Sequence, residues 1–292
     1  MKILLIGRHG QVAQALQRSL APLGDLCVLG SEQLDLQDVA AIRREVRALR
    51  PALIVNAAAH TAVDLAQSEP EQAFAINATA PGVLAEEAAA LGAPLIHYST
   101  DYVFDGSKPV PYLESDAPNP LGVYGQSKLA GERAIQTVGG QHLILRTSWV
   151  YSTQGRNFLL TMQKLLAERD ELKVVNDQIG APTWAASIAE ATAALVRRWQ
   201  AGAPGAWGLY HFSAGGETSW FGFAEAIAAH LAEQNRLRAR LLPIPSSDYP
   251  TPAPRPLNSR LDCSRLQREW GVALPGWRDA LGQCLASPPN RP

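Results

Sequence analysis

The chain has 292 residues, of which 47% are hydrophobic and 18% charged, with a formal net charge of −1. This composition excludes a disordered chain, and the near-neutral charge gives no indication of a nucleic-acid or anionic-membrane partner. The three cysteines, Cys27, Cys263 and Cys284, show no disulfide framework or Cys-x-x-Cys spacing, so a reducing compartment is expected. The initial apolar run is too short for a signal peptide or a spanning helix. The sequence therefore predicts a soluble, cytoplasmic globular protein.

The chain begins with a predicted strand over residues 3–6, a glycine-rich turn and a predicted helix over 11–20. Gly7 and Gly10 stand in the turn. Glycines let the backbone turn sharply and approach a pyrophosphate, and the free N–H groups of the following helix bind the anion. Because the motif directly follows the first strand, it predicts a dinucleotide site.

A second predicted strand, over residues 26–29, bears on the choice of cofactor. In enzymes that use NAD, an acid at the end of this strand usually binds the ribose 2′-hydroxyl. No acid stands at the strand end, although Glu32 is close, and Arg8 in the glycine turn could face the 2′-phosphate of NADPH. The pattern favours NADPH and leaves NADH open. A solvated Arg8 without a ligand is an equal alternative.

Strands and helices continue to alternate as far as residue 150. The further elements expected are helix 38–50, strand 53–55, a long helix ending at 91, strand 94–98, helix 124–138 and strand 142–145. Such alternation predicts an α/β fold with a Rossmann-like, doubly wound parallel sheet. The loop over 107–122, rich in proline, glycine and acids, is expected to cover the ligand site at the carboxyl edge of that sheet.

Tyr124 and Lys128 stand four residues apart in the predicted helix, so their side chains share one face. A phenol has a pKa of about 10 in water. A cation within about 4–6 Å favours the phenolate and lowers that pKa, towards the range where proton transfer is efficient at neutral pH. Thr100 would add a hydroxyl that binds the same substrate oxygen. By itself Tyr-x-x-x-Lys is common, and a surface pair without function is the alternative.

The pattern changes after Tyr151, where less regular elements begin. Expected there are helix 157–169, strand 173–175, helix 186–199, strand 209–212 and helix 220–232. We assign residues 1–150 to a dinucleotide-binding domain, to which 184–208 return. A smaller C-terminal α/β substrate-binding domain would comprise residues 151–183 and 209–292.

Six prolines between residues 243 and 256 exclude a regular helix or central strand and predict an extended arm. Arg255, Asn258 and Arg260 stand at its end. Guanidinium groups bind phosphate oxygens bidentately, so these side chains could clamp a diphosphate. A solvated basic loop is the alternative.

Seven blocks of sequence, in order, resemble the extended short-chain dehydrogenase/reductases and, more narrowly, the dTDP-4-dehydrorhamnose reductases. The resemblance covers nearly the whole chain and rests on Gly7-x-x-Gly10-Gln11-Val12 and on residues 55–64, 99–104, 123–132, 146–151, 177–183 and 255–261. The pair Gly10-Gln11 separates this family from sugar-nucleotide epimerases and dehydratases, whose turn usually reads Gly-x-x-Gly-x-x-Gly. Ala13 replaces the family's usual glycine.

The resemblance implies a role for each matching residue. Tyr124 would donate the proton, Lys128 would lower its pKa and bind the nicotinamide ribose, and Thr100 would tune the phenol. The cofactor would be lined by Gly7, Gly10, Gln11, Val12, Asp35, Leu36, Ala59, His60, Thr61 and Tyr98. The sugar nucleotide would contact Thr100, Asp101 and Trp149.

The resemblance implies NAD(P)H-dependent reduction of the 4-keto group of dTDP-4-dehydro-L-rhamnose, a dTDP-sugar. Two alternatives stay open: an epimerase or dehydratase that keeps its NAD bound, and a non-enzymatic regulatory subunit, since one relative serves methionine adenosyltransferase in that way. Part of the family forms a homodimer assisted by Mg²⁺, and a homodimer stays open for this chain. The helix over 11–20 carries no acid, which argues against such a Mg²⁺ site.

Overall fold

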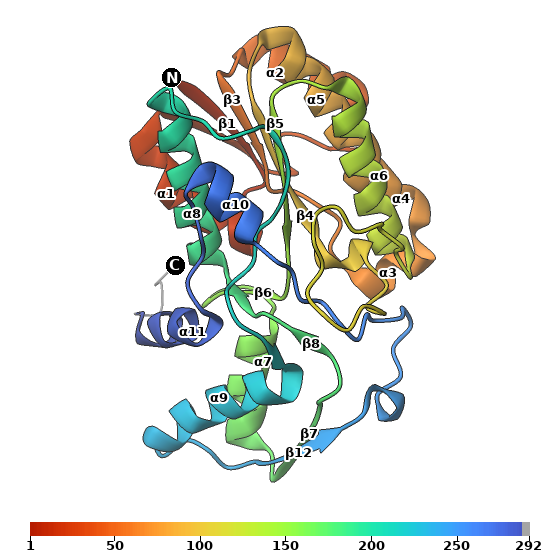
Figure 1. Cartoon of the computed structure of the whole chain (residues 1–292), viewed down its shortest axis with the longest axis vertical. Helices are drawn as coiled ribbons and strands as arrows, with labels where there is room; N and C mark the ends of the chain where they lie inside the picture. The colour runs from red at the N-terminus through yellow and green to blue at the C-terminus, as the bar shows by residue number, and fades with distance from the viewer. Residues whose placement is uncertain (288–292) are drawn as a thin grey trace.

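A computed structural model describes residues 1–287 of the chain. Its centre is a six-stranded sheet in the order β10-β5-β4-β3-β1-β2, in which every neighbouring pair is parallel (Figure 1). The strands are β1 (Lys2–Ile6), β2 (Asp25–Leu29), β3 (Leu53–Asn56), β4 (Leu95–Thr100), β5 (His142–Thr147) and β10 (Gly208–His211). The predicted doubly wound α/β fold is confirmed.

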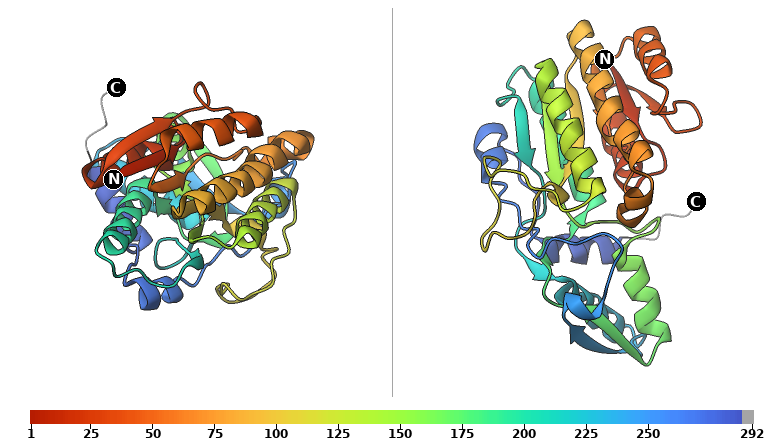
Figure 2. Two further views of the ribbon diagram at one scale, coloured as in Figure 1. Left: turned by 90° about the horizontal axis from the view of Figure 1, so that it is seen from above. Right: turned by 90° about the vertical axis from the view of Figure 1, so that its right-hand side faces the viewer.

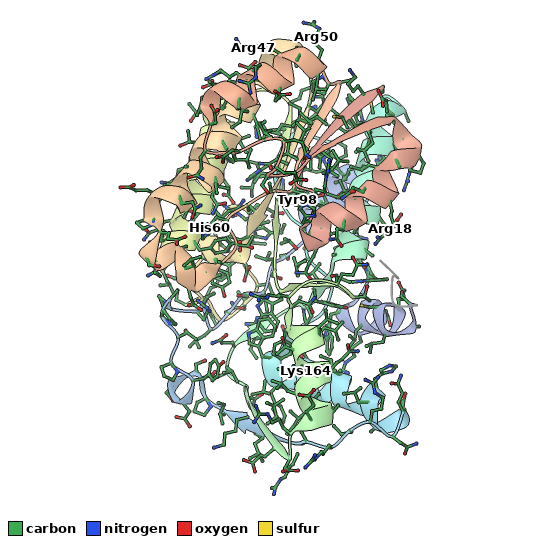
Figure 3. The ribbon with its side chains drawn as sticks, turned by 180° about the vertical axis from the view of Figure 1, so that it is seen from behind. Arg18, Arg47, Arg50, His60, Tyr98 and Lys164 are labelled. Carbon is green, nitrogen blue, oxygen red and sulfur yellow. The ribbon has the colours of Figure 1, made fainter. Side chains whose placement is uncertain are left out.

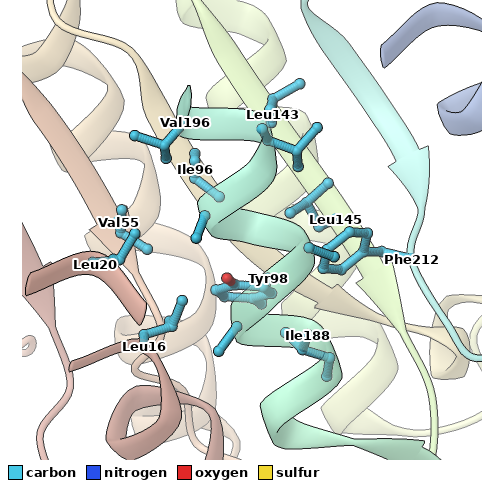
Figure 4. Packing of buried hydrophobic residues seen from close by; sticks show 14 of the residues in the cluster. Leu16, Leu20, Val55, Ile96, Tyr98, Leu143, Leu145, Ile188, Val196 and Phe212 are labelled. Carbon is cyan, nitrogen blue, oxygen red and sulfur yellow. The ribbon is translucent and has the colours of Figure 1, made fainter. Parts of the chain in front are cut away.

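Helices cover both faces of this sheet. One face is covered by α1 (Gln11–Leu20) and α8 (Ala185–Gln200); the other is covered by α2 (Val39–Leu49), α5 (Ala80–Leu91) and α6 (Val123–Val138). Strand β4 serves both layers, because side chains alternate along a strand. Ile96 and Tyr98 pack with Leu16 and Ile188 on the first face (Figure 4), whereas Leu95 joins the core cluster of the second face.

The long helix expected to end at Leu91 is divided in the structure. It consists of α3 (Val63–Ser68), α4 (Pro70–Phe74), a π-helical turn (Ala75–Thr79) and α5. A π-turn interrupts the regular hydrogen-bonding pattern and often marks a functional site. Asn77, which lies in this turn, donates from its amide to the carbonyl of His60 (3.0 Å) and to Ser127 Oγ (3.0 Å), so it ties the loop after β3 to α6.

The rest of the chain forms a smaller part at one end of the sheet (Figure 2). Its core is built by α7 (Phe158–Glu168), α9 (Trp220–Glu233), α11 (Trp277–Ala286) and the parallel pair β7 (Glu171–Val175) and β12 (Arg240–Ile244). Shorter strands are β6 (Val150–Tyr151), β8 (Ile179–Gly180), β9 (Thr183–Trp184) and β11 (Thr218–Ser219). No helix among the described residues is long and apolar enough to cross a membrane.

Two boundary predictions need correction. The assignment of 209–292 to the smaller domain is wrong at its start, because β10 pairs with β5 as the edge strand of the large sheet. Helix α10 (Ser264–Trp270) also packs on that sheet, since Trp270 belongs to its core cluster. The proline arm begins inside β12. Pro243 fits there because, within residues 1–287, β12 pairs with β7 alone and is therefore an edge strand.

Candidate active site

A cleft of about 560 Å³ opens at the carboxyl ends of the sheet strands, where ligands bind in open α/β folds. Besides the glycine turn, most of the cleft lining comes from four segments of the chain, within residues 56–63, 98–102, 124–128 and 147–156. Its lining includes Gly7, Gly10, Gln11, Val12, Asn56, Ala59, Thr61, Tyr98, Thr100, Asp101, Tyr102, Tyr124, Lys128, Ser148, Trp149 and Arg156. The cleft therefore brings together the glycine turn and the Tyr124 helix, which are separated by more than a hundred residues.

The glycine turn has the geometry that a dinucleotide needs. Gly7 has φ +104°, and a Cβ there would lie 3.2 Å from the backbone of Ala57. Gly10 has no atom within 4 Å of a Cβ position and borders the cleft, so the backbone is open to a ligand there. No side chain of the described residues caps the N-terminus of α1, which leaves its N–H groups available to an anion. These features fit a pyrophosphate.

The two residues weighed for cofactor choice contact each other. Arg8 donates to the carbonyl of Val28 (2.9 Å), and its Nη1 lies 3.2 Å from Glu32 Oε1. Arg8 lines the cleft, so a cation and a carboxylate meet beside the place where β2 ends. Asp35 and Leu36 do not line the cleft: the Asp35 carboxylate accepts from the backbone of Gln37, and Leu36 is buried in a core cluster.

Tyr124 and Thr100 meet at the opposite end of the cleft. Thr100 is the last residue of β4, two residues beyond the predicted strand 94–98, and Tyr124 lies in the first turn of α6. Burial raises the pKa of Tyr124 to about 12, and a hydrogen bond with Thr100 acts in the opposite direction. Tyr102 packs edge-on against the phenol, with ring centroids 5.4 Å apart. The Tyr124 phenol is therefore protonated at neutral pH and fixed in position, as a proton donor needs to be.

The spacing of Tyr124 and Lys128 predicted a phenol with a lowered pKa, but the pKa of Tyr124 is raised, because burial outweighs any effect of the nearby cation. The Lys128 side chain turns to β4, where Nζ donates to the carbonyl of Tyr98 (2.7 Å) and lies 3.1 Å from His97 Nε2. Burial lowers the pKa of Lys128 to about 8, and the charge of Glu132 acts in the opposite direction. The physical reason for this correction is desolvation. For both Tyr124 and Lys128, the loss of water around the charged form affects the pKa more than the interaction between the two side chains does.

Asp101 and Trp149 complete the substrate end of the cleft. Thr100 donates to Oδ1 of Asp101 (3.1 Å), whereas Oδ2 has no hydrogen-bond partner among residues 1–287. Burial raises the pKa of Asp101 to about 6. Trp149 has φ +47° and stacks on Trp220, with centroids 3.6 Å apart and planes 9° apart. Stacking on Trp220 holds Trp149 at the cleft, although its backbone is in a strained conformation.

The chain is similar to known proteins over nearly its whole length. The family described as "RmlD substrate binding domain" matches residues 1–288. A protein from Burkholderia thailandensis called dTDP-4-dehydrorhamnose reductase is 47% identical over 98% of each chain. The protein of that name from Escherichia coli K12 is 47% identical over 98% of this chain and 97% of its own. The chain belongs to the dTDP-4-dehydrorhamnose reductase family.

Solved structures place the chain in the same family. A dTDP-4-dehydrorhamnose reductase from Bacillus anthracis, in complex with NADP, is 33% identical with a TM-score of 0.90, over 97% of this chain and 98% of that one. A UDP-glucose 4-epimerase from Thermus thermophilus, in complex with NAD, is 19% identical with a TM-score of 0.78, covering 99% of this chain and 100% of that one. The second likeness concerns the fold alone.

His60 was expected to line the cofactor, but it does not line the cleft. Its neighbours Ala59 and Thr61 line the cleft, whereas its Nε2 lies 3.7 Å from Glu69. Its backbone N–H donates to Asn77 (2.8 Å). In Figure 3, His60 lies on the side of the helices between β3 and β4, whereas Tyr98 is near the centre of the sheet. His60 therefore shapes the loop through its backbone.

Arg255, Asn258 and Arg260, at the end of the proline arm, also lie outside the cleft lining. Arg255 pairs with Asp64 (2.9 Å), and its guanidinium lies 6.0 Å from the ring centre of Tyr102, which does line the cleft. Asn258 donates to the carbonyls of Lys108 (2.6 Å) and Val110 (3.0 Å). These groups hold neighbouring segments in place rather than presenting free donors.

Arg260 completes this arrangement. It donates to Asn258 (2.8 Å), pairs with Glu217 (3.0 Å) and donates to the carbonyl of Pro109. With Asn258 it attaches the loop over 107–122 to the end of the proline arm. The loop over 107–122 is therefore fixed to the end of the proline arm by hydrogen bonds. That this loop covers the ligand site stays a prediction.

Three further residues of the site escaped the sequence analysis. Arg156 lines the cleft, and no carboxylate among the described residues pairs with it. Asn56, at the end of β3, lines the cleft as well. His97 lies beneath it, 1% exposed, in contact with both Asn56 and Lys128. A histidine within the apolar strand was the available signal for that residue.

Proposed function

We propose that this chain catalyses the NAD(P)H-dependent reduction of the 4-keto group of dTDP-4-dehydro-L-rhamnose to dTDP-L-rhamnose. The observation that carries the proposal is the placement of Thr100, Tyr124 and Lys128 on one wall of the cleft, with the glycine turn on another. Relatives 44–48% identical bear the name of this reductase, and one solved relative holds NADP. NADPH is the cofactor we favour, with NADH also accepted.

The chain's own residues supply orientation and a proton. A bound nicotinamide cofactor would supply the hydride. Tyr124 keeps its proton at neutral pH because its pKa is about 12, and it gives that proton to the carbonyl oxygen as charge develops there. Thr100 holds the phenol towards the same oxygen. Lys128 lies within the cleft wall, where its ammonium would contact the nicotinamide ribose and offset the negative charge left on Tyr124.

For the sugar nucleotide we propose contacts with Thr100, Asp101 and Trp149. Arg156 is the cleft cation that we assign to the diphosphate, because Arg255 and Arg260 already have carboxylate partners. A guanidinium without a partner can bind phosphate oxygens bidentately. Arg255, Asn258 and Arg260 act on the substrate indirectly, by fixing Tyr102 and the loop over 107–122.

The proposed reaction includes no role for Mg²⁺, in keeping with the expectation from the sequence. No group of His, Cys, Asp and Glu side chains within residues 1–287 has an arrangement that could hold a metal ion. A homodimer stays a prediction, which sedimentation of the purified protein would test.

The reaction is tested by NADPH oxidation at about 340 nm, with dTDP-4-dehydro-L-rhamnose generated in place by the upstream enzymes. We expect consumption that requires the sugar nucleotide and falls by at least about 100-fold in Tyr124→Phe, with NADPH binding retained. Tyr249→Phe, which alters an exposed tyrosine outside the cleft, is the matched control. Folded protein that consumes neither NADPH nor NADH, or that carries stoichiometric NAD, would overturn the reductase assignment.

A further inference from the structure

Three buried polar side chains form a row from the sheet to α6; the first and last of them line the cleft, and the middle one lies beneath it. Asn56 on β3 and His97 on β4 are paired residues of neighbouring strands. Asn56 Nδ2 lies 3.1 Å from His97 Nδ1, and His97 Nε2 lies 3.1 Å from Lys128 Nζ. Their exposed fractions are 1%, 1% and 2%. At such burial, each donor needs an acceptor opposite to it.

The backbone fixes the direction of this row. The N–H of Ala58 can only donate, and it donates to Oδ1 of Asn56 (3.1 Å). The other end of that amide is therefore the NH₂ group, which can only donate to His97 Nδ1. Nδ1 must then be without a proton. Burial lowers the pKa of His97, so the ring is neutral and carries its single proton on Nε2.

The proton on Nε2 points at Lys128. An ammonium has three N–H donors and no acceptor, so it cannot accept from Nε2–H. An uncharged amine has a lone pair and can accept that bond, while its own N–H donates to the carbonyl of Tyr98. The ammonium form faces a donor instead, unless the imidazole changes tautomer and gives up its bond from Asn56. Either way, the arrangement of β3 and β4 opposes the charge on Lys128.

Other charged groups around Lys128 do not remove this opposition. Glu132 lies one turn along α6 and favours the ammonium, but its carboxylate already binds Arg146 through two hydrogen bonds of 2.8 and 2.6 Å. Tyr124, on the same helix, is protonated at neutral pH. Asp101, beyond the end of β4, is buried and hydrogen-bonded to Thr100. The donor facing Lys128 directly is His97.

We propose that His97, oriented by Asn56, is a positioning residue that weakens the ammonium form of Lys128 and so makes Lys128 a group that exchanges its proton near neutral pH. Its consequence for catalysis rests on the proposed function. Once Tyr124 has given its proton to the substrate oxygen, Lys128, one turn along α6, can return a proton to the phenolate; the ammonium becomes the uncharged amine, which then takes up a proton from solvent. A permanent cation would stabilise the phenolate but release its own proton slowly.

The test follows the titration of Lys128 in the cofactor-free protein, so it needs no turnover. The chain has five lysines, at positions 2, 108, 128, 164 and 173. With ¹³C-labelled lysine, the Cε signals are followed by NMR against pH, and Lys128→Met identifies the signal of Lys128. We expect a midpoint of about 8 for Lys128, well below the value of about 10.4 for a lysine side chain in a model peptide.

In His97→Gln, a side-chain oxygen can replace the Nε2–H group and accept from the ammonium. The midpoint of Lys128 should then rise by about one pH unit or more, the size expected when a repulsive contact is exchanged for one hydrogen bond. The alkaline limb of the pH profile of kcat should move in the same direction. Thr192→Val is the control: it removes a hydroxyl that bonds Tyr98 on the other face of β4, and should leave the titration unchanged.

Asn56→Asp provides a second variant should His97→Gln fail to fold. A carboxylate oxygen facing Nδ1 accepts a hydrogen bond from Nδ1–H, so the imidazole carries its proton on Nδ1 and Nε2 can accept from Lys128. The midpoint of Lys128 should again rise. The inference is overturned if Lys128 titrates at the model-peptide value of about 10.4, or if neither variant moves its midpoint. Because the titration uses free protein, its result is independent of whether the reductase assay succeeds.

Discussion

Helix α6 carries two buried charged side chains one turn apart, Lys128 and Glu132, which are held in opposite ways. Glu132 has a full set of charged and polar partners: Arg146 binds both of its oxygens, and Ser99 donates to one of them. Lys128 has the carbonyl of Tyr98 and a neutral imidazole. One charge is compensated within the fold, and the other is not.

The difference separates a structural ion pair from a functional group. A buried carboxylate that is paired bidentately and hydrogen-bonded gains little by changing its charge. A buried amine without a counter-ion lies close to losing its proton, and perturbed groups of this kind are typical of catalytic sites. The cleft reaches Lys128, whereas Glu132 is outside its lining. Three substitutions test this contrast through the free energy of unfolding.

The largest effect is expected for Glu132→Gln. The variant leaves the guanidinium of Arg146 buried without a counter-charge, so the free energy of unfolding should fall by about 3–5 kcal/mol. Denaturant unfolding measures the loss. Glu86→Gln is the matched control, because Glu86 is half exposed where it pairs with Arg43. Its substitution should lower the free energy of unfolding by less than about 1 kcal/mol. Equal, small losses in both variants would contradict the contrast.

A smaller effect of opposite sign is expected for Lys128→Met. Methionine removes a buried charge without a counter-ion, so the free energy of unfolding at pH 7 should rise by about 1–2 kcal/mol, allowing for the lost bond to Tyr98. Turnover should fall by at least about 100-fold. A loss of stability as large as that of Glu132→Gln would show that Lys128 is also compensated.

The pH dependence of Lys128→Met follows from the lowered pKa of Lys128. Above about pH 10.5 the amine is uncharged in both the folded and the unfolded state, and the two proteins should differ least. As pH falls, the unfolded state takes up the proton first, so the wild-type protein loses stability. That loss is complete below about pH 8. Unfolding measured between pH 7 and pH 10 should show the difference shrinking as pH rises.

The smallest effect is expected for Asp101→Asn. Asp101 resembles Lys128 in being buried without a counter-ion, and its pKa is raised from 3.8 to about 6. The cost of its charge is absent below about pH 4 and complete above about pH 6. Asparagine should therefore raise the free energy of unfolding by about 1 kcal/mol at pH 7 and by nothing at pH 4. Equal stability at both values would show that this charge is compensated.

Much of the sheet could be predicted from the sequence because apolar runs and turn residues act locally. Strands β1 to β5, helix α6 and the glycine turn of Gly7 and Gly10 all lie where expected. The placement of β10 escaped prediction, since its partner β5 is about 60 residues away and nothing local specifies that pairing. The π-helical turn between α4 and α5 also escaped prediction, since Asn77 in that turn bonds His60 and Ser127, which lie 17 and 50 residues away along the chain.

At the site, residue types were easier to predict than their partners. Tyr124, Thr100 and Lys128 do line one cleft. Their electrostatics differ from the expectation, because burial, which a motif does not report, raises the pKa of the phenol and lowers that of the amine. Similarly, Arg260 and Asn258 were expected to be free donors, but distant carbonyl groups of the loop over 107–122 occupy them.

The central claim is that the cleft reduces the C4 carbonyl of a dTDP-sugar with a net transfer of hydride. The most direct measurement uses NADPH with deuterium at C4 of the nicotinamide, on each face in turn, and mass spectrometry and NMR of the sugar product. We predict that deuterium from one face appears at C4 of the sugar, in step with NADPH consumed. Product formed without deuterium, from protein that retains tightly bound NAD, would contradict the claim and identify an epimerase or dehydratase.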